Sequence, residues 1–222
     1  HQYSHGFHQY PARMHPEIAR RIIQKYARNS TDVILDPFMG SGGVLVESLL
    51  NGNNSLGIDL NPFAVLLSKV KTTPINAKNL EETYQEIIRK SKLDSQKNVK
   101  YENTPEELDL KFWYPLDSRK KLPILKNHVF NIQNKNLRNF FMICFSLTTR
   151  RASYQKNSIY KTYRMKPEKR EDFEPDTFKI FTNICQKNIK NMIGFNSEIE
   201  SKKANAYPIL GDTRDLGNQF SK

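Results

Sequence analysis

Apolar and polar residues alternate in a helix-and-strand pattern over the first third of this 222-residue chain. From Pro16 to Tyr26, apolar side chains recur at helical spacing with basic residues on the opposite face, which predicts a helix. Residues 32–35 and 55–59 are short apolar runs typical of buried strands. Between them, the Gly-rich segment 40–43 leads into an apolar stretch, residues 44–50, that predicts a second helix. Strand, Gly-rich turn, helix and strand within about thirty residues indicate a βαβ unit of a parallel, doubly wound sheet.

The pattern changes after this region. A further helix is expected from Pro62 to residue 70, and beyond it residues 75–204 are rich in Lys and Asn and lack strand patterning. Apolar residues at helical spacing predict three helices there, around residues 80–88, 137–145 and 178–189. This part of the chain therefore looks like a large helical insertion.

The predicted fold class is α/β, a Rossmann-like doubly wound sheet with a large, mainly helical insertion. We expect residues 1–74 to form its first part, residues 75–204 the insertion, and residues 205–222 a returning segment whose strand lies at 207–210. A complete sheet of this type has about six strands, and only three are evident. The sheet is therefore expected to be incomplete.

The charge balance points to a polyanionic partner. Lys and Arg number 35 against 23 Asp and Glu, which gives a formal net charge of +12 and favours nucleic acid as the partner. The longest apolar run, residues 140–145, is too short to cross a bilayer, and no signal peptide opens the chain. We expect a cytoplasmic protein without a membrane contact.

Cysteine and histidine give no sign of a disulfide scaffold or a metal site. Cys144 and Cys185 are too few for a disulfide framework, and each lies in an apolar helical pattern typical of a core residue. His5, His8 and His15 fit no compact ligand spacing, so we expect no bound metal.

The strongest chemical signal is Asp36-Pro-Phe-Met-Gly-Ser-Gly-Gly43, placed after a strand and before a helix. Glycines suit a tight turn that lets a ligand approach the free N–H groups of the helix start. A nicotinamide-binding turn would read GxGxxG, whereas here Asp36 would repel a pyrophosphate and attract an ammonium group. Asp59, 23 residues later at the end of the second strand, is placed to hold a ribose diol. Together they favour S-adenosylmethionine as the cofactor.

Three segments resemble the motifs of DNA amino-methyltransferases, the enzymes that methylate N4 of cytosine or N6 of adenine, often in restriction–modification systems. They are Tyr10-Pro-Ala-Arg-Met-His-Pro16, Asp36-Pro-Phe-Met-Gly-Ser-Gly42 and Gly57-Ile-Asp-Leu-Asn-Pro62. The likeness is dense over residues 1–74 and resumes more weakly at Leu210-Gly-Asp-Thr-Arg-Asp-Leu216.

The resemblance implies a cofactor-binding role for residues of each motif. In the family, the first motif covers the methionine end of the cofactor, the Gly-rich motif cradles it, and the later residues bind the ribose and the adenine. The corresponding residues here are Pro11, Ala12 and Met14; Asp36, Phe38, Gly40 and Gly42; Asp59, Asn61, Pro62 and Phe63; and Asp212.

The family's catalytic motif has no counterpart in this sequence. That motif is an Asp, Asn or Ser followed by Pro-Pro and an aromatic residue, which hold the target amine and stack on the flipped base. The sequence contains no Pro-Pro, and the motif order would place it after about residue 220. We therefore expect this chain to hold no catalytic residue and to carry the cofactor-binding part. Three explanations of the missing motif are compatible with the sequence: a second polypeptide carries the catalytic half, the enzyme is truncated, or a segment has been omitted.

A basic segment in the insertion is the candidate DNA contact. Residues 150–170 hold eight Lys and Arg against one Glu, with three Tyr interleaved. The expected DNA-binding residues are Arg150, Arg151, Lys156, Lys161 and Arg164. A solvated loop is the alternative interpretation, and DNA contact is slightly favoured because a variable insertion often reads the target sequence in the enzymes that this chain resembles. For the aromatic cluster at residues 112–115, a packing role is favoured over stacking on a base.

Three functional hypotheses follow. The first is a site-specific DNA methyltransferase acting on duplex DNA, with cytosine-N4 slightly favoured over adenine-N6 on the resemblance alone. The second is an RNA methyltransferase acting on a guanine amine, because that group shares the Asp-Pro-Phe-x-Gly-Ser-Gly motif. The third is a non-catalytic DNA-binding subunit or fragment, to which the missing catalytic motif points.

Overall fold

The computed structural model describes residues 3–11, 13–101, 109–156 and 162–215 of the chain. The chain forms two compact units, one made of His1–Ile75 with Lys190–Lys222 and the other of Asn76–Ile189. Each unit has its own core and is described by itself.

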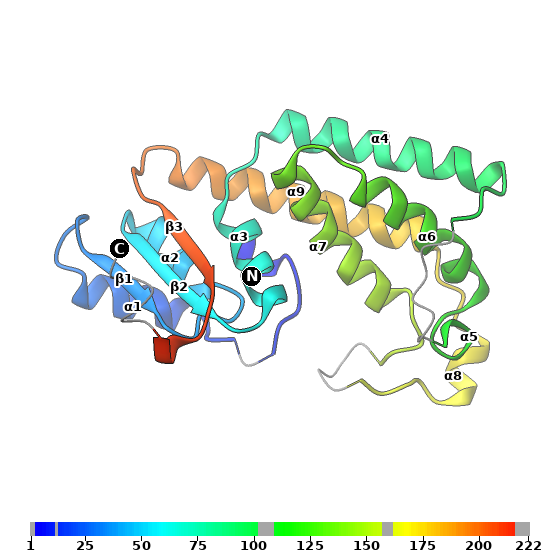
Figure 1. The fold of residues 1–222 in the computed structure, drawn as a ribbon, viewed down its shortest axis with the longest axis horizontal. Helices are drawn as coiled ribbons and strands as arrows, with labels where there is room; N and C mark the ends of the chain where they lie inside the picture. Colours follow the sequence, from blue (N-terminus) through cyan, green and yellow to red (C-terminus); the bar gives the residue numbers. More distant parts are fainter. Residues whose placement is uncertain (1–2, 12, 102–108, 157–161, 216–222) are drawn as a thin grey trace. The chain divides into compact units, whose positions relative to one another are not determined.

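The first unit is built on a three-stranded parallel sheet (Figure 1). Strands β1 (Val33–Asp36), β2 (Asn54–Asp59) and β3 (Ala206–Leu210) lie side by side in that order. The connections carry helices α2 (Gly43–Asn51) and α3 (Pro62–Thr72), and α1 (Pro16–Tyr26) precedes β1 and packs against α2. The expected α/β class with a small parallel sheet is confirmed.

One face of the sheet is sealed by α2 and α3. Met39, Leu45 and Val65 form a buried cluster there. Gly57 of β2 lies so close to this cluster that an added Cβ would sit 2.6 Å from the sulfur of Met39 and 2.8 Å from Leu45 Cδ1. A side chain at position 57 would therefore separate the sheet from α2.

The opposite face of the sheet presents apolar side chains to solvent. The register pairs Leu35 with Leu56 and Leu56 with Tyr207, so the three side chains form one row across the strands. Leu35 is 50% exposed, Tyr207 55% and Val33, on the same face of β1, 63%. Parallel sheets are usually covered on both faces, so this open face is a notable feature of the unit.

The second unit is helical. Its helices are α4 (Ala77–Gln96), α5 (Leu110–Trp113), α6 (Leu116–Phe130), α7 (Lys135–Arg151), α8 (Pro167–Glu171) and the first part of α9 (Thr177–Ile199). Helices α4, α6 and α7 pack on one another, and α7 contributes Phe140, Phe141 and the buried thiol of Cys144. The last part of α9 belongs to the first unit.

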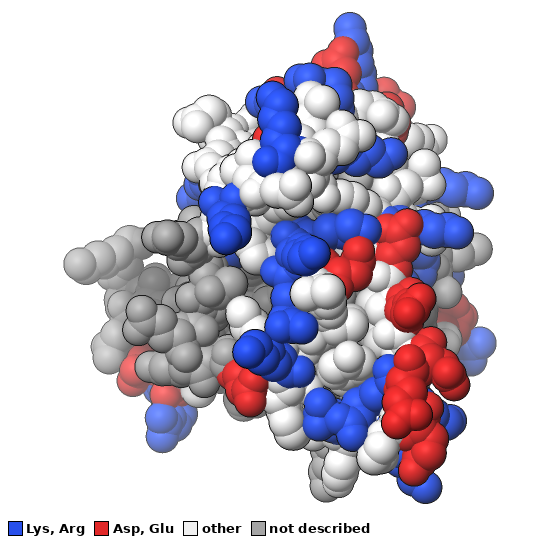
Figure 2. Space-filling view, turned by 90° about the vertical axis from the view of Figure 1, so that its right-hand side faces the viewer, with Lys and Arg blue, Asp and Glu red and all other residues white. Residues whose placement is uncertain are grey.

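Charge is unevenly distributed over the surface. Figure 2 shows Lys and Arg side chains gathered in a band on one face, beside a separate cluster of Asp and Glu. No helix in the described part of the chain combines the length and the apolar character of a membrane-spanning segment.

Candidate cofactor site

The loops that follow the three strands meet at one edge of the sheet. The amide of Gly211, after β3, donates to the backbone carbonyl of Asp59 at 3.1 Å. The amide of Gly40, after β1, donates to the Asp59 carboxylate at 2.9 Å, and the Thr213 hydroxyl donates to the carbonyl of Pro37. Because the strands are parallel, their carboxyl ends share this edge, which is where ligands bind in open α/β sheets.

The Gly-rich turn has a shape that only glycine permits. Gly40 and Gly42 have φ angles of +48° and +71°, and an added Cβ at Gly42 would lie 2.6 Å from Ser68 Oγ. Gly42 caps α2 without a side-chain hydrogen bond, so the first amides of that helix keep their donors available. The turn therefore presents backbone N–H groups at a helix start.

Two carboxylates give the site a negative charge. The Asp36 carboxylate accepts from the amide of Phe38 at 3.1 Å, and burial, with a smaller effect from the negative charge of Asp59, raises the pKa of Asp36. The two oxygens of Asp59 accept from the amides of Gly40 at 2.9 Å and Asn61 at 2.8 Å. A carboxylate oxygen accepts more than one hydrogen bond, so Asp59 can also bind ligand hydroxyls. The pair suits a ligand that carries a positive group.

Tyr10 is a further candidate for the site, although the sequence motifs alone give it no role. Its ring lies against the Gly-rich turn, where an added Cβ at Gly40 would be 3.3 Å from Tyr10 Cε1. Its hydroxyl accepts from the side-chain amide of Asn61 at 3.4 Å. Burial, and then the negative charge of Asp59, raises the pKa of Tyr10. The only sequence signal was that Tyr10 opens the first family motif.

The other predicted residues of the first motif, Pro11, Ala12 and Met14, follow Tyr10 closely in sequence. Pro11 and Met14 are exposed. Ala12 lies outside the described residues. Phe38, in the Gly-rich motif, is 79% exposed.

Asn61, Pro62 and Phe63 occupy the start of α3. The Asn61 side chain caps the helix by accepting from the amide of Phe63 at 2.9 Å, and Pro62 takes the first helical position. The Phe63 ring makes an edge contact with His8, with centroids 5.0 Å apart. These contacts bring the amino-terminal segment to the helix that follows β2.

Asp212 follows β3 at the same edge. Its carboxylate accepts from the guanidinium of Arg214, with Nε at 3.0 Å, and this pairing lowers the pKa of Asp212 to about 2. The side chain is thus ionised and engaged by a neighbour in its own turn.

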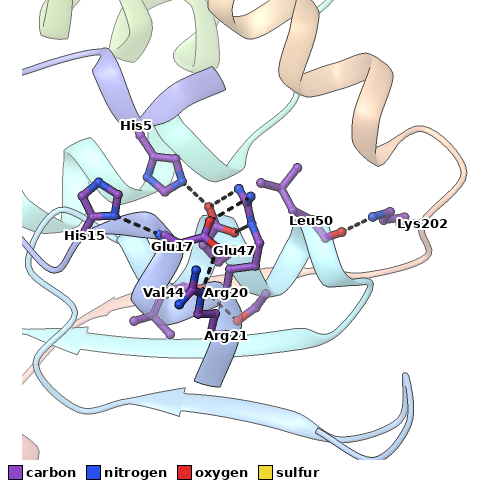
Figure 3. A network of polar contacts seen from close by, with 10 residues as sticks. His5, His15, Glu17, Arg20, Arg21, Val44, Glu47, Leu50 and Lys202 are labelled. Carbon is purple, nitrogen blue, oxygen red and sulfur yellow. Dashed lines mark hydrogen bonds and ion pairs between the residues drawn. The ribbon is translucent and has the colours of Figure 1, made fainter. Parts of the chain in front are cut away.

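A buried polar network attaches the amino-terminal segment to α2 (Figure 3). Glu47 accepts from His5 Nε2 at 2.8 Å and from Arg20 Nε at 2.9 Å. Burial alone would raise the pKa of Glu47, but the hydrogen bonds from His5 and Arg20 lower it. His15 caps the start of α1, where its Nδ1 accepts a hydrogen bond from the amide of Glu17. Among the residues that the structure describes, no group of His, Cys, Asp or Glu could hold a metal.

The described residues of the basic segment lie in the second unit, where residues 154–156 pair with residues 163–165; these two paired stretches are called the basic hairpin. Gln155 and Arg164 form an antiparallel bridge, and the amide of Lys156 donates to the carbonyl of Tyr163 at 2.8 Å. The Arg164 guanidinium lies 3.9 Å from the centre of the Phe112 ring and 5.5 Å from that of Tyr154. The aromatic cluster and the hairpin are therefore one packed structure.

Of the remaining predicted DNA contacts, Lys156 lies in the basic hairpin. Arg150 and Arg151 occupy the last turn of α7, directly before the hairpin. Lys161 lies outside the described residues.

Comparison with known proteins agrees with this geometry. Residues 1–70 match the family model described as DNA methylase. Type II methyltransferase M.MvaI of Kocuria varians is 33% identical over 204 residues, which are 89% of this chain and 45% of that protein. Type II methyltransferase M.MjaII of Methanocaldococcus jannaschii is 32% identical over 124 residues, 53% of this chain and 23% of that protein. No solved structure matches the chain.

A shorter stretch is similar to an RNA-modifying enzyme. The tRNA (guanine(10)-N2)-dimethyltransferase of Methanothermobacter thermautotrophicus is 40% identical over 52 residues, 23% of this chain and 16% of that protein.

The parallel sheet with its Gly-rich turn, the match of residues 1–70 to the DNA methylase model and the similarity to type II methyltransferases are consistent with one another. The predicted resemblance to DNA amino-methyltransferases of restriction–modification systems is confirmed. The chain spans less than half the length of these type II relatives.

Proposed function

We propose that this chain carries the S-adenosylmethionine-binding part of a site-specific DNA methyltransferase that modifies N4 of cytosine or N6 of adenine. The observation that carries the proposal is the hydrogen bond between the Gly-rich turn and the acidic end of β2, Gly40 to Asp59, within a chain related to type II methyltransferases. When bound, the cofactor supplies an activated methyl group on a positively charged sulfur.

The chemistry of the side chains fits this cofactor. Asp36 would attract the ammonium group of its methionine part, and Asp59 would accept hydrogen bonds from its ribose hydroxyls. The free amides of the Gly-rich turn would face its acceptor groups. Of the remaining predicted contacts, Asn61, Pro62, Phe63 and Asp212 would lie near the adenine, and the loop from Tyr10 to Met14 would cover the methionine part.

DNA would be held by the basic hairpin of the second unit. Lys156, Arg150 and Arg151 offer cations to phosphates, and exposed Tyr163 offers a ring for stacking. Methyl transfer needs the target amine in line with the methyl group, with the base flipped from the duplex. We assign none of these residues to that step.

The open face of the sheet would receive the catalytic half of the enzyme. Apolar side chains at Val33, Leu35 and Tyr207 fit the helices that normally cover the second face of a parallel sheet. We propose that a polypeptide segment with the Pro-Pro-aromatic motif binds there, whether as a separate chain or as a continuation of this one.

Calorimetric titration with S-adenosylhomocysteine, the demethylated product, tests the cofactor assignment. Wild-type protein should bind it, and Asp59→Asn should weaken binding about tenfold or more, because a charged acceptor is replaced by a neutral one. Asp172→Asn, an exposed carboxylate of the second unit, is the matched control and should bind normally. Folded wild-type protein that does not bind the product would disprove the proposal.

An RNA guanine-amine methyltransferase is the second candidate, and its support is the similarity to the tRNA dimethyltransferase. Gel-shift titrations with duplex DNA and with tRNA at the same salt concentration separate the two. The DNA proposal predicts tighter binding of the duplex, whereas a preference for tRNA would favour the RNA enzyme. Binding of DNA without any binding of the cofactor would favour a non-catalytic subunit.

A further inference from the structure

Lys71 is a buried cation directly behind the Gly-rich turn. It belongs to α3, its residue is 1% exposed, and its ammonium donates to the carbonyl of Ser41 at 2.8 Å. Among the described residues, no carboxylate pairs with this ammonium. The charged groups that face it are Arg13 and His5 of the amino-terminal segment, and His5 is itself bound to Glu47 of α2.

Ser68, one turn earlier on α3, contacts the same turn. Its hydroxyl donates to the carbonyl of Gly40 at 3.1 Å. Two successive carbonyls of the turn are thus fixed towards α3. A trans peptide unit directs its N–H opposite to its C=O, so the amide of Ser41 points away from α3. Within the described part of the chain that amide makes no hydrogen bond. It precedes the free amides at the start of α2, with only the amide of Gly42 between them, which donates to the carbonyl of Met39 at 2.8 Å.

The position of Lys71 is poorly explained by stability. A buried ammonium with one carbonyl partner loses much of its hydration, and an apolar side chain of similar length would fill the space at lower cost. Burial, followed by the positive charge of Arg13, lowers the pKa of Lys71 to about 7. Its protonation state therefore changes near neutral pH.

We propose that Lys71 and Ser68 are positioning residues of the S-adenosylmethionine site, holding the carbonyls of Ser41 and Gly40 away from the cofactor so that the turn presents only amides to it. The inference rests on the proposed function and assigns to that site two residues that do not touch the ligand. A protonated Lys71 holds the turn more strongly than a neutral one, because a charge-assisted hydrogen bond is about twice as strong. Cofactor affinity should therefore depend on the protonation of Lys71.

Titrations with S-adenosylhomocysteine at pH 6.0, 7.0 and 8.5 test the inference on wild type, Lys71→Met, Ser68→Ala and Lys69→Met. Lys69 is the matched control, because it is exposed on the same helix. At pH 6.0 we expect Lys71→Met to bind about tenfold more weakly than wild type and Ser68→Ala about threefold more weakly, the losses of a charged and a neutral hydrogen bond. The difference between wild type and Lys71→Met should shrink towards pH 8.5.

Comparing wild type with Lys71→Met at each pH cancels the effects of two other groups that titrate. The amino group of the ligand and the carboxyl of Asp36 change charge equally in wild type and Lys71→Met. Thermal unfolding of each variant without ligand checks that it is folded, and Ser68→Ala tests the same turn without removing a charge. Equal affinity of wild type and Lys71→Met at every pH, or a loss that does not change with pH, would overturn the inference. Wild-type protein that does not bind at any pH would refute the proposed function itself.

Discussion

The carboxylate of Asp59 and the amide of Gly40 are joined by a hydrogen bond of 2.9 Å across 19 positions of the chain. This contact links the end of β2 to the turn that follows β1, so the ribose-binding candidate and the Gly-rich cradle are parts of one structure. The second oxygen of Asp59 holds the amide of Asn61 and thereby the start of α3. A change at Asp59 should therefore affect both the shape of the turn and the binding of a ligand.

Gly42→Ala should destabilise the first unit by about 2–4 kcal/mol, since it places a Cβ at positive φ and against a packed neighbour. The added Cβ would lie 2.6 Å from Ser68 Oγ and 2.8 Å from Ser68 Cβ. Urea unfolding measures the loss.

Two further variants make the Gly42 result specific. Gly43→Ala is the matched control and should be nearly neutral, because nothing lies within 4 Å of its added Cβ. In a double-mutant cycle, Ser68→Gly should recover part of the loss caused by Gly42→Ala. Strict additivity of the two changes would contradict the packing described for the turn.

Binding of the cofactor product should weaken in acid. Burial raises the pKa of Asp36, so its carboxylate loses its charge at a higher pH than an ordinary Asp as the pH falls. The attraction for the ligand ammonium is then lost. Calorimetry between pH 4 and 7 on wild type and Asp36→Asn measures this effect. Asp36→Asn should bind the product weakly, and its affinity should fall less steeply in acid than that of wild type. An equally steep fall of the affinity in the variant would exclude Asp36 as the cause of the acid effect.

Stability should depend on pH through Lys71. Its folded-state pKa of about 7 lies below the ordinary value of 10.5, so the unfolded chain binds more protons between these limits. The unfolding free energy of wild type should therefore rise relative to that of Lys71→Met by up to about 1.4 kcal/mol per pH unit between pH 7 and 10. Urea unfolding across this range measures the difference. A constant difference would mean that Lys71 titrates normally in the folded state.

Arg164 should contribute to DNA binding through both its charge and the shape of the hairpin. Its guanidinium stacks on Phe112 and lies near Tyr154, so Arg164→Ala removes a cation and a packing contact together. We expect weaker binding to a DNA duplex. The slope of the logarithm of the binding constant against the logarithm of the salt concentration should fall by about one, the loss of one phosphate contact.

Arg164→Lys separates the two effects. It keeps the charge but not the planar stack, so we expect it to retain the salt dependence and lose part of the affinity. Unchanged affinity in Arg164→Ala would show that the hairpin does not contact DNA.

The elements of the sheet could be predicted because their signals are local. Apolar runs that end at Asp36 and Asp59, with glycines between them, indicate the βαβ unit and the edge at which its loops meet. Strand β3 could be predicted although 146 residues separate it from Asp59, because the family motif around Gly211 and Asp212 marks its end.

Other contacts depend on packing that no local pattern encodes. Tyr10 reaches Gly40 and Asn61, and Phe112 stacks on Arg164, 52 positions away. In the sequence nothing distinguishes Lys71 from the other lysines. Only the fold shows that it is buried beneath the Gly-rich turn. The role of Lys71 becomes visible only when helix α3 is placed against the turn.

An NMR titration of the isotope-labelled protein with S-adenosylhomocysteine tests the cofactor site most directly. We expect amide signals to shift first and most at Gly40–Gly43 and at Asp59–Phe63, and we expect Asp59→Asn to reduce these shifts at the same ligand concentration. Shifts confined to other parts of the chain, or no shifts in folded wild-type protein, would contradict the cofactor site described above.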